Sequence, residues 1–99
     1  MKTNFNNIIQ SETPVLIDFY ADWCSPCKQL APILKEVKKE LQDSIKIIKI
    51  DVDKNRSLAS KYEVRGVPTM LLFKSGKQVW RQSGVVHKND ILNVIRPHL

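Results

Sequence analysis

The chain has 99 residues, and the 42% hydrophobic and 26% charged fractions are typical of a single globular domain spanning residues 1–99. They exclude a disordered or fibrous chain. The formal charge is +6, but no aromatic residues alternate with the lysines, so solvated helix faces are favoured over nucleic-acid binding. No apolar run reaches the ~18 residues of a membrane span, and the first residues lack a signal peptide's apolar stretch, so we expect a cytoplasmic chain without a membrane partner.

The first part of the chain predicts a short helix and a buried strand. Residues 4–10 place Phe5, Ile8 and Ile9 on one side of a helix, which the run ending at Pro14 then interrupts. Residues 15–20 are apolar on both faces, as in a strand that is covered from both sides. Asp18 is the one exception in this strand.

A long amphipathic helix is predicted over residues 26–43, followed by a strand over residues 46–52. Pro32 lies inside the helical pattern and is expected to kink the helix, because proline removes one backbone donor. The strand is rich in isoleucine. The hydrophobic residues with helical spacing are Leu30, Ile33, Leu34, Val37 and Leu41.

The second half predicts a short helix before Gly66, a hairpin and a last helix. Gly76 is expected to take a positive φ in the hairpin turn, and Asn89 or Asp90 is expected to cap the last helix, which Pro97 ends. A strand, a helix and a second strand in succession require a parallel pair with a right-handed crossover. The expected fold is therefore α/β, with a mixed four-stranded sheet and helices on both faces. The elements after the second strand are helix 58–62, strand 69–73, turn 74–77 and strand 78–83.

Two cysteines, Cys24 and Cys27, lie at the start of the long helix. Unpaired backbone N–H groups there favour a thiolate on Cys24, and Pro26 suits the first helical turn. Three other interpretations are less favoured: a structural disulfide, a zinc site and a pair of inert core thiols. A structural disulfide is less favoured because a bond that closes so short a loop stabilises the fold only weakly. Zinc needs four ligands with close spacing, and only His87 and His98 remain as candidates.

The segment Trp23–Lys28, WCSPCK, resembles the active site of the thioredoxin family. The resemblance continues at Asp18–Ala21, Pro32, Lys49 and Tyr62–Thr69, and then at the hairpin and Gly84. It implies the thioredoxin fold and a monomeric protein disulfide reductase that binds no cofactor and cycles through a Cys24–Cys27 disulfide. It also implies disulfide-containing protein substrates and an NADPH-dependent flavoprotein reductase as partners.

The same resemblance implies roles for individual residues. Cys24 is expected to attack a target disulfide and Cys27 to resolve the mixed disulfide, with Asp18 as proton acceptor and Lys49 as its charge partner. Burial in an apolar strand is also expected to raise the pKa of Asp18. Pro68 is expected to follow a cis bond that brings the Val67 backbone beside Cys24. The expected substrate groove consists of Trp23, Gly66, Val67, Pro68, Gly84 and Val85.

The chain departs from the family's pattern at three places. Ser25 replaces a glycine, and together with Pro26 it is expected to tune the redox potential. Only residues 1–3 precede the first helix, so the family's N-terminal edge strand is expected to be short or missing, leaving 46–52 at a sheet edge. Tyr20 stands where tryptophan is common, with little expected consequence.

The sequence is also compatible with two other functions. The same fold can serve an oxidase or isomerase with a more oxidising cysteine pair, or a docking module in which redox chemistry is incidental. No Gly-rich loop between a strand and a helix is present to bind a dinucleotide, so NADPH would belong to the partner.

Overall fold

The computed structural model describes residues 4–99. The strands are β1 (Val15–Tyr20), β2 (Lys46–Asp51), β3 (Thr69–Lys74) and β4 (Lys77–Ser83). The helices are α1 (Phe5–Ile9), α2 (Ser25–Leu41), α3 (Arg56–Lys61) and α4 (Lys88–Ile95), with short 3-10 turns η1 (Gln42–Ser44) and η2 (Arg96–His98).

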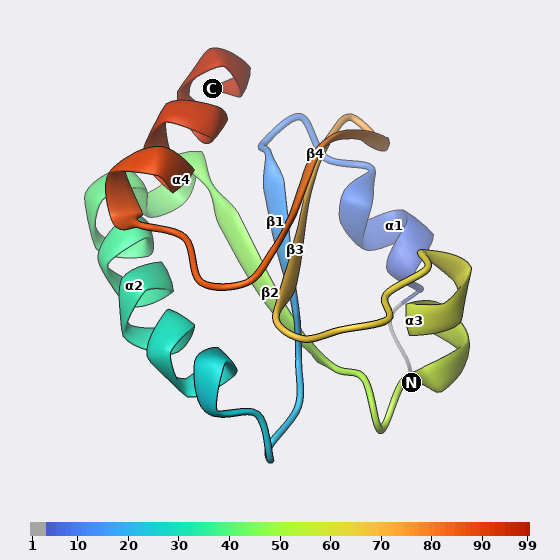
Figure 1. Ribbon diagram of the computed structural model, residues 1–99. Coiled ribbons are helices and arrows are strands. Elements are labelled where there is room, and N and C mark those ends of the chain that lie inside the picture. Colours follow the sequence, from blue (N-terminus) through green and yellow to red (C-terminus); the bar gives the residue numbers. More distant parts are fainter. Residues whose placement is uncertain (1–3) are drawn as a thin grey trace.

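The strands form one mixed sheet in the order β2-β1-β3-β4. β1 and β2 are parallel, whereas β3 is antiparallel to both β1 and β4. Helices α2 and α4 cover one face of this sheet, and α1 and α3 cover the other (Figure 1). The expected α/β fold with a four-stranded sheet and helices on both faces is confirmed.

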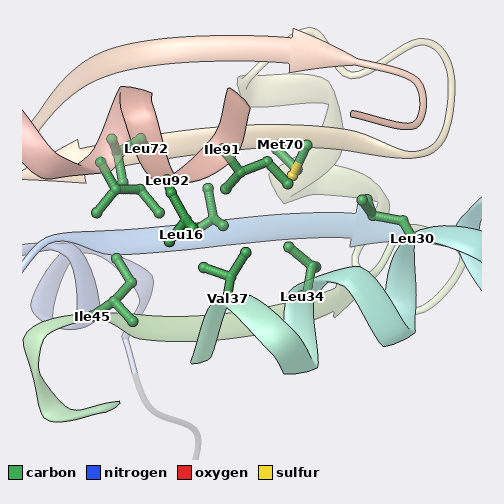
Figure 2. Packing of buried hydrophobic residues seen from close by; sticks show 10 residues of the cluster. Leu16, Leu30, Leu34, Val37, Ile45, Met70, Leu72, Ile91 and Leu92 are labelled. Carbon is green, nitrogen blue, oxygen red and sulfur yellow. The ribbon is translucent and has the colours of Figure 1, made fainter. Parts of the chain in front are cut away.

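Two hydrophobic clusters hold the helices to the sheet, one on each face. Leu16 of β1 packs with Leu30 and Leu34 of α2 (Figure 2). The neighbouring residues Ile17 and Phe19 pack in the opposite cluster, which α1 and α3 cover. Because successive side chains of a strand point to opposite faces, Asp18 shares the face of Leu16 and lies beneath α2.

The ends of two helices differ from the sequence prediction. Helix α2 runs without interruption through the exposed Pro32, but it ends at Leu41 because Gln42 adopts a positive φ of 49°. The prediction that Asn89 or Asp90 caps the last helix is wrong. His87 is the N-cap, since its extended backbone lets its carbonyl accept the N–H groups of Asp90 and Ile91.

The C-terminal end of the last helix also differs. Regular helix α4 ends at Ile95, two residues before Pro97, which lies inside the 3-10 turn η2. Within residues 4–99, β2 pairs only with β1 and so forms an edge of the sheet. The prediction about the family's N-terminal edge strand concerns residues 1–3, which lie outside the described residues.

Candidate active site

The strand ends bring distant segments together at one end of the sheet. The parallel strands β1 and β2 both end there, and the antiparallel β3 begins there. The start of α2, the loop after β2 and the loop before β3 therefore lie close together at the lower end of the view in Figure 1. All the sequence-predicted groove residues belong to these segments or to the turn after β4.

Cys24 and Cys27 form a disulfide across the first turn of α2, with their Cα atoms 5.3 Å apart. Cys24 is the N-cap of the helix, as the sequence indicates, and its Sγ accepts the backbone N–H of Cys27 at 3.2 Å. Both side chains are buried, at 3% and 5% exposure. A sulfur held by a backbone N–H at a helix N-terminus is in an environment that favours a thiolate over a thiol. The residues that pack around the pair are Tyr20, Ala21, Val52 and Val67.

The segment before β3 lies against Cys24. The Val67–Pro68 peptide bond is cis, and the carbonyl oxygen of Val67 lies 3.6 Å from Sγ of Cys24. Gly84, with a φ of 89°, donates its N–H to the carbonyl of Pro68 at 2.9 Å. The carbonyl of Gly66 accepts the hydroxyl of Thr69 at 2.7 Å. These bonds hold the loop before β3 and the turn after β4 against each other.

Trp23 lies on the surface beside the disulfide, with 70% of its side chain exposed. Its Nε1–H donates to Oδ2 of Asp53 at 2.8 Å, so the ring is oriented by the loop after β2. The indole borders a hollow of about 110 Å³ whose other lining residues are Val52, Val64, Arg65, Gly66 and Val67. Sequence reasoning missed Asp53, Val52, Val64 and Arg65.

Asp18 is 1% exposed, and neither of its carboxylate oxygens has a hydrogen-bond partner among the described residues. Burial raises the pKa of this carboxyl from 3.8 to about 6, and the nearby Lys49 ammonium opposes part of that rise. Lys49 is the register partner of Asp18 on β2. Its Nζ lies 4.7 Å from the centroid of the Tyr20 ring. The fold therefore keeps an acid that titrates near neutrality on the face of the sheet that α2 covers.

The remaining predicted residues lie at the edge of the site. Ser25 and Pro26 occupy the first turn of α2, and both are exposed. Val85 is 43% exposed after β4. Lys49 is exposed on the edge strand β2, on the side of Asp18 rather than in the groove beside Trp23. Over residues 4–99, no three His, Cys, Asp or Glu side chains are grouped to hold a metal ion.

The fold and the vicinal cysteine pair at a helix N-terminus define a dithiol–disulfide oxidoreductase. A family model described as Thioredoxin matches residues 1–97, and the chain belongs to the thioredoxin family. It performs thiol–disulfide exchange through Cys24 and Cys27 as a protein-disulfide oxidoreductase. Membership of this family implies disulfide-containing substrates and a partner that reduces the pair.

Several relatives are similar over most of the chain. A thioredoxin of Rickettsia prowazekii is 44% identical over 90 residues, which cover 91% of this chain and 86% of that protein. Thioredoxin 1 of Synechococcus elongatus is 39% identical over 93% of this chain and 86% of its own length. Among solved structures, a mutant thioredoxin from Halobacterium salinarum NRC-1 has a TM-score of 0.87. It is 39% identical, and the match covers 99% of this chain and 85% of that one. None of the described helices is both long and apolar enough to cross a membrane.

Proposed function

We propose that the chain is a protein disulfide reductase in which Cys24 is the nucleophile and Cys27 the resolving cysteine. The observation that carries this assignment is the contact between Sγ of Cys24 and the backbone N–H of Cys27 at 3.2 Å. A backbone donor at a helix N-terminus lowers the pKa of the thiol that it contacts, and the thiolate is the attacking species. Cys27 lies one turn further into α2 and reacts second.

The reaction proceeds in two exchanges. The Cys24 thiolate attacks one sulfur of the target disulfide, the target S–S bond breaks, and the second target sulfur leaves as a thiolate that takes up a proton. Cys27 then loses its proton and attacks Sγ of Cys24. The mixed disulfide breaks, its target sulfur leaves as a thiolate that takes up a proton, and the Cys24–Cys27 disulfide forms. Two electrons have then passed to the target, which leaves as a dithiol.

Asp18 accepts the proton of Cys27 in the second exchange, directly or through water. Its pKa of about 6 supports this role, because an acid that titrates near the working pH both takes and returns a proton readily. Its burial beneath α2, the helix that carries Cys27, also supports it. Lys49 stabilises the charged form of Asp18 as its neighbour on β2.

The substrate binds beside Trp23 as an extended segment. The Val67 carbonyl next to Cys24 offers a backbone acceptor to such a segment, in the manner of an added strand. Ser25 and Pro26, exposed beside the sulfurs, tune the redox potential of the pair. The proposed groove consists of Trp23, Gly66, Val67, Pro68, Gly84 and Val85.

The partner that returns electrons to Cys24 and Cys27 is an NADPH-dependent flavoprotein reductase, and the chain acts as a monomeric single domain in the cytoplasm. The sequence carries no Gly-rich loop between a strand and a helix for a dinucleotide, which supports a separate partner as the protein that binds NADPH. The sensitivity of a dithiol to oxidation supports a reducing compartment for a chain that works as a reductant.

The order of the two cysteines is tested by trapping. Cys27→Ser retains the nucleophile and lacks the resolving thiol, so it is expected to accumulate a mixed disulfide with an oxidised protein such as insulin. Cys24→Ser is the matched control and is expected to trap far less. Non-reducing gel electrophoresis and mass spectrometry of the adduct give the readout. Trapping by Cys24→Ser alone would reverse the assignment.

The direction of electron flow is tested by the equilibrium reduction potential of the pair. Tryptophan fluorescence in dithiol buffers is expected to give a value near the roughly −270 mV of a cytoplasmic reductant. A value between about −180 and −120 mV would make the chain an oxidase or isomerase instead.

A further inference from the structure

The hollow beside Trp23 continues along the surface away from the cysteines. It shares Val52, Val64 and Arg65 with a hollow of about 550 Å³ that borders α3. That second hollow shares Glu63 and Arg65 with a third, of about 580 Å³, which reaches β4. The three hollows form one continuous surface depression, which we call the track. It begins at the proposed substrate groove and passes the C-terminal end of α3.

Cations dominate the two outer hollows. Four exposed basic side chains line them, and Glu63 is the one acidic residue in either lining. We call these two outer hollows the basic groove. Its basic residues are Arg56, Lys61, Arg65 and Arg81.

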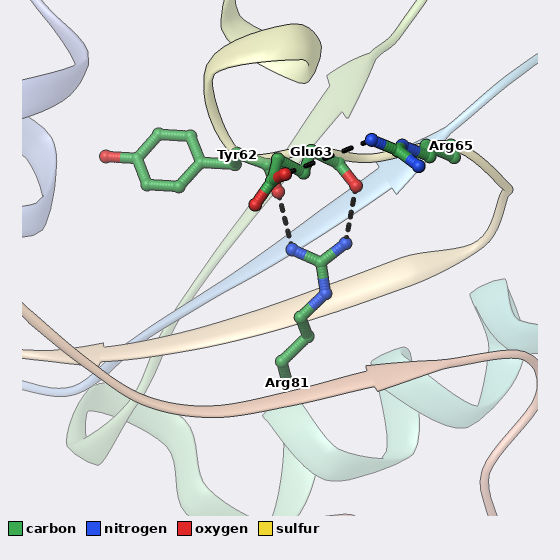
Figure 3. Close-up of polar contacts among 4 residues, drawn as sticks. All are labelled: Tyr62, Glu63, Arg65 and Arg81. Atoms are coloured by element: carbon green, nitrogen blue, oxygen red, sulfur yellow. Dashed lines mark hydrogen bonds and ion pairs between the residues drawn. The ribbon is translucent and has the colours of Figure 1, made fainter.

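The charges in the basic groove are poorly neutralised by the chain itself. The guanidinium of Arg81 donates to the backbone carbonyls of Tyr62 and Glu63, at 2.8 Å for Glu63, and both acceptors are uncharged (Figure 3). Arg65 contacts the Glu63 carboxylate only at 4.0 Å, with both side chains largely exposed. An exposed pair at that distance contributes little, so a carboxylate from another molecule can replace it.

We propose that the basic groove binds an acidic, extended segment of the substrate protein that adjoins the reactive disulfide. The proposal rests on the function proposed above, because the target disulfide must lie beside Cys24 for its flanking residues to follow the track. Charge complementarity identifies the occupant: a chain bearing several Asp or Glu residues meets four cations and one carboxylate. The hollow at Val67 and Trp23 continues into the basic groove, so a segment that flanks the target cysteine can reach the groove along the same polypeptide.

The test compares three short disulfide peptides with the same reactive core. One carries four acidic residues beside the disulfide, one four neutral residues and one four lysines, in versions with the flank on either side. Stopped-flow tryptophan fluorescence follows oxidation of the reduced chain. The acidic peptide is expected to react faster than the neutral one at low ionic strength, and the advantage is expected to shrink as salt is added.

Two double variants distinguish the effect of the cations in the basic groove on the reaction rate from the effect of the net charge of the molecule. Arg56→Gln with Lys61→Gln removes two cations of α3, and Lys35→Gln with Lys39→Gln removes two exposed cations of α2. The first double variant is expected to lower the reaction rate of the acidic peptide about fivefold, as for the loss of two exposed ion pairs, and to leave the rate of the neutral peptide unchanged. The second is expected to leave both rates within about twofold.

The outcomes distinguish this proposal from the function on which it rests. Equal rates for the acidic and neutral peptides, or equal losses in the two double variants, would overturn the basic groove while leaving disulfide reduction intact. Failure to reduce any of the peptides would overturn the proposed function. The basic groove is then tested alone by calorimetry, in which a cysteine-free acidic peptide is added to the Cys24→Ser, Cys27→Ser chain. Saturable binding that becomes weaker when Arg56→Gln and Lys61→Gln are added supports the groove. The absence of binding overturns it.

Discussion

At Asp18 the chain places a carboxyl where packing alone would favour a leucine. The unfolded carboxyl titrates near 3.8 and the folded one near 6, so between these pH values the folded chain binds more protons than the unfolded chain. The free energy of unfolding must therefore fall as pH rises through this window and level off above it. A destabilising carboxyl on the face that α2 covers supports the proton-accepting role proposed for Asp18.

Asp18→Asn removes this pH dependence because an amide does not titrate. The free energy of unfolding of the variant minus that of the native chain is therefore expected to rise by about 2 kcal/mol from about pH 4 to pH 7. Urea unfolding of both proteins across that range measures the difference, in which the other titrating groups cancel. Parallel stability curves would show that Asp18 does not carry the raised pKa.

The same substitution tests the proton transfer. Asp18→Asn keeps the shape of the side chain but accepts no proton, so resolution of the mixed disulfide is expected to slow by about tenfold or more. Single-turnover kinetics that separate attack from resolution give the readout. Slowing confined to resolution supports the proposed role, whereas unchanged turnover from about pH 6 to pH 9 would contradict it.

The bond between Trp23 and Asp53 makes the indole a fixed rather than a freely rotating surface. Asp53→Ala removes the acceptor and is expected to raise KM for a protein disulfide about threefold, as for the loss of one exposed hydrogen bond. Asp53→Asn retains an oxygen acceptor and is expected to restore most of the affinity. A change in KM as large for Asp53→Asn as for Asp53→Ala would show that charge, not orientation, matters there.

These residues differ in how far the sequence could predict them. Asp18, Cys24 and Cys27 stand out locally, by polarity within an apolar strand and by spacing at a helix start. Asp53 does not, because its partner lies 30 residues away and the contact exists only once the chain has folded. Arg65 is similar, because its place beside Trp23 depends on the folded conformation of the loop before β3.

Among the elements, the β3–β4 hairpin has the most specific local requirement. Lys74 pairs with Lys77, so the turn contains only Ser75 and Gly76, with φ of 51° and 82°. Positive φ at both central positions is the pattern of a type I′ turn, which favours Asn-Gly. The turn also donates to the carbonyls of Ser11 and Ile9, which ties the hairpin to the segment before β1.

Two substitutions in this turn are expected to have opposite effects. Ser75→Asn better suits a positive φ and is expected to stabilise the chain by about 0.5 kcal/mol. Gly76→Ala is expected to destabilise it by about 1–2 kcal/mol, because a Cβ there would lie 2.5 Å from the Gln10 side chain and the φ is unfavourable. The midpoints of urea unfolding measure both. Equal midpoints for the two variants would contradict this description of the turn.

Element types can be predicted more successfully than element ends. Hydrophobic periodicity indicates α2 and α4 correctly, since it reflects the face that packs on the sheet. The ends depend on single backbone conformations that leave no periodic signal. Gln42 ends α2 through its positive φ, and His87 begins α4 with no side-chain cap.

For the whole molecule, the connectivity of the sheet follows from the order of elements and the right-handed crossover, which is why the topology is predictable. The distribution of charge over the folded surface is not predictable in this way. Lysines and arginines are spread along the sequence, and only the folded chain brings Arg56 and Arg65 into hollows that meet Arg81 of β4. The sequence therefore indicates the reactive pair but not the basic groove.

The redox state is expected to change the stability of the whole chain. Closing a loop between Cys24 and Cys27 restricts the unfolded chain, and the entropy of so short a loop corresponds to about 2 kcal/mol. The oxidised chain is therefore expected to unfold at higher denaturant than the reduced chain. The Cys24→Ser, Cys27→Ser variant is the control, and its midpoint should not respond to reductant. Identical midpoints for the two redox states of the native chain would contradict the prediction.

The cap of α2 has a consequence for spectroscopy. Sγ of Cys24, the proposed nucleophile, is also the atom that accepts the backbone N–H of Cys27, at 3.2 Å. In the reduced chain a thiolate holds that amide proton more strongly than a neutral thiol does. The rate at which the Cys27 amide exchanges its hydrogen with deuterated solvent should therefore slow as the Cys24 thiol ionises. A single backbone signal would thus report the charge of the nucleophile without a label.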